Sequence, residues 1–117
     1  MDYRDIISEI AISIFNSVGP GFEKEVYQNA LKISLKKNNL VLESKLIPIN
    51  YENQTIGTLT VDVVQYRVVI LIDSGCNLNV DEYIAKCANA KRIAQIPYGI
   101  VCLFPTTLQN DLIVRIV

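Results

Sequence analysis

The 117-residue chain contains no histidine. This absence excludes Ser-His-Asp and Cys-His nucleophilic catalysis, zinc sites with histidine ligands, and acid–base chemistry by an imidazole. Any catalysis must therefore use carboxylates, lysines, a tyrosine or a hard metal ion with oxygen ligands.

Cysteine is scarce, and its three residues (Cys76, Cys87 and Cys102) include no pair at CxxC spacing. An odd number without metal-ligand spacing indicates neither a disulfide framework nor a zinc site. We interpret all three as small buried apolar residues in a reducing compartment. No apolar run reaches the roughly twenty residues of a bilayer span, and the N-terminus is acidic and periodic, unlike a signal peptide. We therefore expect an intracellular, cytoplasmic protein with no membrane partner.

The chain has no excess of charge of either sign, with 11 basic and 12 acidic residues. Half of the residues are apolar, which is typical of a globular protein, and the length suits a single domain over residues 1–117. Binding of nucleic acid would need a local basic patch, because the net charge gives no polyanion-binding signature. The frequent isoleucine, asparagine and lysine are typical of AT-rich genomes, such as those of some bacteria and large DNA viruses.

Periodicity predicts an α/β domain with the element order ααβββαββ and a mixed sheet covered by helices. The first helix ends at the GPG of residues 19–21, and the second is expected to turn Val26, Ala30, Leu31 and Ile33 inward. The predicted helices span residues 2–18, 22–37 and 79–94, and the predicted strands span residues 44–51, 55–64, 68–73, 100–104 and 111–117.

Two carboxylates stand out in the strands of residues 58–75, which hold almost no other ionisable group. Because side chains alternate between the faces of a strand, Asp62 shares a face with Thr58 and Thr60. Asp73 ends the predicted strand of residues 68–73, in which all five preceding residues are apolar. A continuous apolar run of this kind is typical of a strand that is buried on both faces. The pair raises the question of a metal site, but we favour a structural role for Asp62, satisfied by hydroxyls or backbone amides.

The segment GPGFEKEVYQNAL at residues 19–31 resembles the GxxExxY protein family, a branch of the PD-(D/E)XK nuclease-like superfamily. The SKLIPINY strand and its hairpin, the VDVV strand and the final VRIV follow in the order that the family leads one to expect. The resemblance implies a mixed sheet with an antiparallel meander flanked by helices. It also implies Mg²⁺-dependent phosphodiester hydrolysis, with one acid on the second meander strand and an acid and a lysine on the third.

This sequence departs from that pattern at most site positions. Asp62 matches the first acid, but Ile72 and Ser74 stand where the second acid and the lysine are expected. Asp73 is displaced by one residue and should face away from Asp62, unless a bulge turns it back. On the second helix, Lys24 takes the place of the family's glutamate, between Glu23 and Glu25, and the polar residue of the third helix falls near Lys86.

We therefore expect a catalytically inactive pseudoenzyme that retains the nuclease-like fold and acts as a structural or interaction component. Its expected partner is a second copy or another protein, bound through an exposed apolar surface or the last strand. Neither a metal nor another cofactor is expected in this interpretation.

Two alternatives remain open. A divergent nuclease would bind Mg²⁺ or Mn²⁺ through Asp62 and a bulged Asp73, with Glu25 and either Lys86 or Lys24 completing the site. A nucleic-acid-binding module without cleavage would use a basic patch of Lys32, Lys36, Lys37, Lys91 and Arg92.

Overall fold

The computed structural model describes residues 2–117, in which three helices and five strands form. Their order confirms the predicted ααβββαββ arrangement, and most boundaries lie within two residues of the predicted ones. In chain order the elements are α1 (Tyr3–Val18), α2 (Lys24–Lys37), β1 (Leu42–Tyr51), β2 (Gln54–Val64), β3 (Val68–Ser74), α3 (Val80–Ala94), β4 (Tyr98–Phe104) and β5 (Ile113–Ile116).

The strands form one sheet in the order β1-β2-β3-β4-β5. The pairs β1/β2, β2/β3 and β4/β5 are antiparallel, whereas β3 and β4 are parallel. A parallel pair needs a long crossover, which α3 supplies. The predicted mixed sheet with an antiparallel meander is thereby confirmed.

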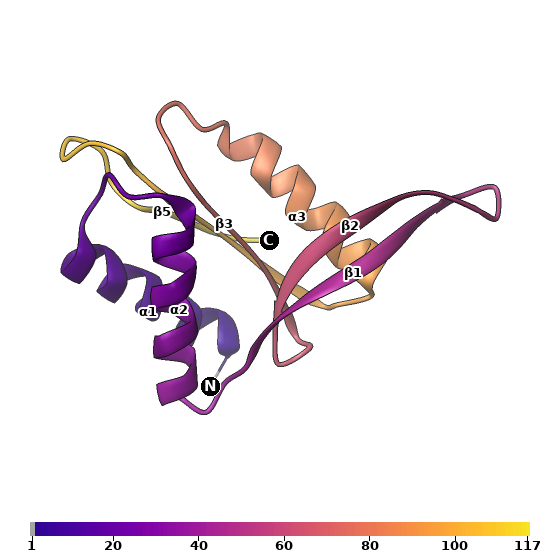
Figure 1. Cartoon of the computed structure of the whole chain (residues 1–117), viewed down its shortest axis with the longest axis horizontal. Coiled ribbons are helices and arrows are strands. Elements are labelled where there is room, and N and C mark those ends of the chain that lie inside the picture. The colour runs from indigo at the N-terminus through magenta and orange to yellow at the C-terminus, as the bar shows by residue number, and fades with distance from the viewer. Residues whose placement is uncertain (1) are drawn as a thin grey trace.

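The helices cover both faces of the sheet, α1 and α2 on one and α3 on the other (Figure 1). Alternation along the strands supplies both cores, since Val64 and Ile70 pack with α1 and α2 while Val63 and Val69 pack with α3. No helix in residues 2–117 combines the length and apolar character needed to cross a bilayer.

The rotation of α2 about its axis differs from the prediction. Tyr27, Leu31 and Leu35 are buried, whereas Val26 and Ile33 are 38% and 60% exposed. The helix has apolar residues on two sides, and the ring of Tyr27 selects the inner one by stacking on a core phenylalanine of β4. Of the four residues expected to face inward, Leu31 is fully buried and Ala30 is partly buried, so the prediction for Val26 and Ile33 was wrong.

The hairpin of β1 and β2 extends well beyond the rest of the molecule (Figure 1). Its strands pair from Leu42–Val64 out to Tyr51–Gln54, but β2 pairs with β3 only at residues 62–64. Glu52 and Asn53 turn the chain with φ of 48° and 62°, as a two-residue hairpin turn requires. We call residues 46–59 the arm: Ile47 and Leu59 at its base pack against the core, and among residues 2–117 its outer part is paired only strand to strand.

Candidate functional site

Asp62, the one acid at an expected site position, lies on the face of the sheet covered by α2. Its Oδ1 accepts a hydrogen bond of 2.6 Å from the Ser44 hydroxyl, and its Oδ2 accepts one of 3.4 Å from the Gln28 amide. Both donors are neutral side chains from neighbouring elements, β1 and α2. The carboxylate is thus satisfied by a hydroxyl and an amide, which agrees with the structural alternative for this residue.

Ile72 occupies the place of the second acid in space as well as in sequence. Asp62 lies opposite Ile70 in the β2/β3 pair, and Ile72, two residues further on, projects from the same face. Its side chain packs against the core beneath α1 and α2. A hydrocarbon side chain has no lone pair for a metal, so this position contributes packing.

Ser74 stands in the lysine position and fastens the corner between α1 and α2. Its hydroxyl donates a 2.9 Å hydrogen bond to the carbonyl oxygen of Phe22. Two backbone bonds lie nearby, from the Gly21 N–H to the Pro105 carbonyl and from the Gly75 N–H to the Phe104 carbonyl. The GPGF corner (residues 19–22) is therefore attached to the carboxyl ends of β3 and β4, a contact that no sequence signal indicated.

Asp73 lies on the opposite face of the sheet from Asp62. The β3/β4 register continues without a shift through Asp73 and Ser74, so no bulge reverses the side chain. Its carboxylate accepts hydrogen bonds from the Tyr83 hydroxyl on α3 and from the Ser74 N–H. Burial raises the pKa of Tyr83 to about 12, and the hydrogen bond to the Asp73 carboxylate adds to this rise. The expectation that the two aspartates point apart is confirmed.

The helical residues of the candidate nuclease site are likewise divided between the two faces. Lys24 is half-buried at the start of α2, and Glu25 beside it is exposed in the first turn, where an acid favours the helix dipole. Lys86 is on α3, with its ammonium 5.2 Å from the centre of the Tyr83 ring. The fold therefore separates Asp62 and Glu25 from Asp73 and Lys86.

The five basic residues considered for nucleic-acid binding also fall into two groups. Lys32, Lys36 and Lys37 are exposed on α2, whereas Lys91 and Arg92 lie on α3, across the sheet. The Lys91 ammonium donates to the Val117 carbonyl at 2.8 Å, so it is engaged within the fold. Only the α2 lysines share one free surface.

Tyr27, on α2, holds the GPGF corner in place. Its hydroxyl donates to the Gly19 carbonyl at 2.8 Å and accepts from the Phe22 N–H at 3.3 Å. Its ring is stacked on that of Phe104, with centroids 4.0 Å apart. The residue thus holds both ends of the corner against β4.

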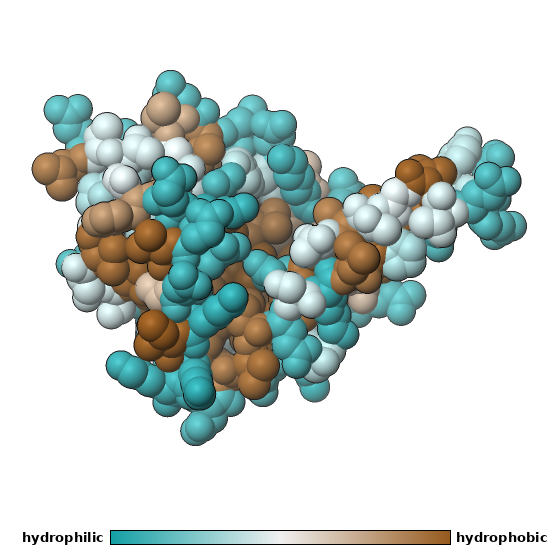
Figure 2. All heavy atoms as spheres, viewed as in Figure 1, coloured by the Kyte–Doolittle hydropathy of each residue, from teal (hydrophilic) through white to brown (hydrophobic). Residues whose placement is uncertain are grey.

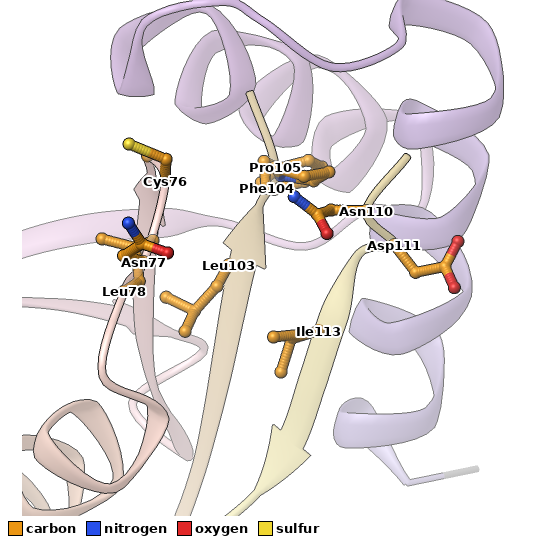
Figure 3. A pocket seen from close by; sticks show the side chains of 10 residues that line it. Cys76, Asn77, Leu78, Leu103, Phe104, Pro105, Asn110, Asp111 and Ile113 are labelled. Carbon is orange, nitrogen blue, oxygen red and sulfur yellow. The ribbon is translucent and has the colours of Figure 1, made fainter. Parts of the chain in front are cut away.

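A pocket of about 330 Å³ opens beyond the carboxyl ends of the parallel strands β3 and β4 (Figure 3). Leu103 and Ile113 lie along it, and the Asp111 carboxylate points away from both (Figure 3). Neither Asp62 nor Asp73 lines this pocket. Cys76, at its mouth, is exposed, so the prediction of burial was wrong for this cysteine, although Cys87 and Cys102 are buried.

The side chains around Asp62 do not fit the divalent ion that the family resemblance implies. Mg²⁺ prefers several oxygen ligands with carboxylates among them, and here one carboxylate is surrounded by neutral donors and Ile72. Across residues 2–117, no three acidic, cysteine or histidine side chains gather as a metal-binding group. The groups around Asp62 therefore suit hydrogen bonding within the fold rather than coordination of Mg²⁺.

Comparison with known proteins gives one match. The family model of the PD-(D/E)XK nuclease superfamily matches residues 1–116, nearly the whole chain. No curated protein and no solved structure matches. The mixed five-stranded sheet with helices on both faces is consistent with that family's fold. The chain therefore belongs to the PD-(D/E)XK nuclease superfamily.

Proposed function

We propose that this chain is a non-cleaving member of the superfamily that acts through contacts with another protein. The main support is the third meander strand, where Ile72 faces the same side as Asp62 and Ser74 is bonded to Phe22. A metal-dependent hydrolase needs acids and a cation at these places, because they hold the ion and stabilise developing charge. The motif GPGFEKEVY further supports a place in the GxxExxY branch.

The number of missing catalytic groups favours loss of phosphodiester hydrolysis. Losing a single group that stabilises charge in the transition state commonly costs two or three orders of magnitude in rate. Here Lys24, Ile72 and Ser74 replace three of the four expected groups. The combined loss would leave no useful rate from Asp62 alone.

The test is a cleavage assay on the full chain. Single- and double-stranded DNA and RNA are incubated with Mg²⁺ or Mn²⁺, beside samples that contain a chelator. We expect the same product yield with and without the chelator, for the native chain and for Asp62→Ala. Metal-dependent cleavage that Asp62→Ala abolishes would overturn the proposal in favour of the divergent nuclease.

A second candidate function is binding of nucleic acid without cleavage. It is supported by Lys32, Lys36 and Lys37, which are exposed on one helix and form no ion pair within residues 2–117. Phosphate contacts of this kind weaken steeply as salt rises. Binding should therefore fall with salt and with replacement of the three lysines by glutamine, but not in Lys86→Gln on the other face. Binding that is insensitive to salt and to the triple substitution would exclude this function.

A further inference from the structure

An apolar stripe on the outer side of α2 is largely exposed within residues 2–117. Val26, Ala30 and Ile33 follow one another at spacings of four and three, so they lie along one side of the helix. Val26 and Ile33 are exposed, and Ala30 between them is partly buried against the core; we call these three residues the outer stripe. An exposed stripe of this kind is typical of a contact surface.

The arm is a second exposed apolar surface. Leu46 and Ile56 are 69% and 65% exposed, Tyr51 is similarly exposed, and Glu52 is the only charged residue in the arm. Figure 2 shows apolar residues along the arm and a hydrophilic tip. An isolated two-stranded hairpin is marginally stable in water, so cover from another surface would stabilise the arm.

Pairing of strands is not the way in which the arm would be covered. β1 is an edge strand, and Pro48, in its outer half, has no N–H to offer to an added strand. At the other edge, β5 has only four residues. Packing of side chains from the arm against an apolar surface avoids this obstacle.

We propose that the arm of one copy packs along the outer stripe of α2 in a second copy, and that the second arm packs reciprocally on the first copy. This inference rests on the proposed function, in which the chain acts through a protein partner. The arm extends away from its own α2 (Figure 1), so this contact forms between two molecules. Because every copy carries both surfaces, a twofold pair closes and leaves neither one free.

The arm and α2 match in length, and the arm tip and the last turn of α2 carry opposite charges. About six residues per strand give the arm a length of roughly 20 Å. The 14 residues of α2 give it a length of about 21 Å. The single arm charge, Glu52, is at the tip, while Lys36 and Lys37 lie at the last turn of α2. We therefore assign the orientation in which the tip meets the last turn of the partner helix.

The first test is the concentration dependence of the mass of the full chain, measured by analytical ultracentrifugation. We expect a dimer, and we expect Leu46→Ser and Ile33→Ser each to raise its Kd about tenfold or more, because each change occurs twice in a symmetric pair. The matched control is Leu108→Ser, which removes an apolar side chain that is 91% exposed on a loop far in sequence from both surfaces. Circular dichroism confirms that each variant is folded.

The second test exchanges charges between the two surfaces. Glu52→Lys alone and the Lys36→Glu/Lys37→Glu pair alone should each weaken the dimer, because like charges then meet at both contacts. Mixing the two variants should restore it, since one contact then has all charges reversed and the other is native. Restoration in the mixture is specific to contact between the tip and the last turn.

The outcomes separate this inference from the proposed function. A chain that is monomeric at all concentrations, forms larger open assemblies, or has a dimer unaffected by these substitutions overturns the inference. Such a result leaves the absence of cleavage intact. Metal-dependent cleavage by a chain that dimerises as described would instead overturn the proposed function alone.

Discussion

The hydroxyl of Ser74 donates a 2.9 Å hydrogen bond to the carbonyl oxygen of Phe22, 52 residues earlier in the chain. The bond joins the end of β3 to the corner that leads into α2. Family resemblance implies a lysine at this position, where a charged head would face a metal site. The serine instead serves the fold, so the position has a structural role that can be measured separately from catalysis.

Ser74→Ala should lower the free energy of unfolding by about 1 kcal/mol, the net contribution of a typical hydrogen bond. Urea unfolding of the variant and the native chain measures the difference. Ser17→Ala is the matched control, because Ser17 is exposed near the end of α1. An equal loss in both variants would show that the bond to Phe22 contributes nothing.

Gly99→Ala should destabilise the protein by about 1 to 3 kcal/mol, the usual cost of overpacking. An added Cβ would lie 2.7 Å from the Cys87 sulfur and 2.8 Å from the Lys91 Cδ, closer than real contacts allow. Gly57→Ala, where nothing lies within 4 Å, should change stability by less than about 0.5 kcal/mol. Thermal or urea unfolding compares the two, and similar values would contradict the packing between α3 and β4.

Tyr83→Phe should reduce stability at pH 8, with a difference from the native chain that narrows between pH 10 and 12. Burial and the Asp73 carboxylate raise the pKa of Tyr83 from 10.0 to about 12, so the folded state holds this proton more tightly than the unfolded chain does. The resulting stability is complete below pH 10 and is lost as the pH rises to 12. Melting temperatures measured from pH 8 to 12 test this.

Two buried thiols also contribute stability that is lost at high pH, because burial raises the pKa of Cys87 to about 11 and that of Cys102 to about 12. Both remain in the Tyr83→Phe variant, so the comparison with the native chain removes their contribution. A difference that stays constant across this pH range would show that the tyrosine proton is not held as described.

Ile72→Glu should create a weak site for Mn²⁺ beside Asp62, because it adds a second carboxylate on the same face. The variant should be less stable without metal, since a charge then replaces a packed hydrocarbon. Added Mn²⁺ should raise its melting temperature, because a ligand that binds the folded state stabilises it. The double variant Asp62→Ala/Ile72→Glu lacks the first carboxylate and should show no such rise; an equal rise would refute the assigned facing.

The order and type of the elements were predictable from the sequence because they depend on local patterns. Displacement by one residue from the second-acid position at Ile72 was sufficient to predict that Asp73 faces away from Asp62, since side chains along a regular strand alternate. The hairpin followed from two β-rich runs separated by a short polar turn. The missing acid and lysine at Ile72 and Ser74 were likewise visible, because they are a matter of residue identity.

The side of α2 that faces the core, and the long-range contacts of the residues around it, were decided only by the tertiary structure. A helix with apolar residues on two sides can bury either, and the stacking of Tyr27 on Phe104, 77 positions later, selects one. The attachment of Ser74 to Phe22 and the division of the lysines between two layers depend on similar long-range contacts. Local periodicity determines which residues share a face, but only packing between distant segments decides which face is buried and which is left for a partner.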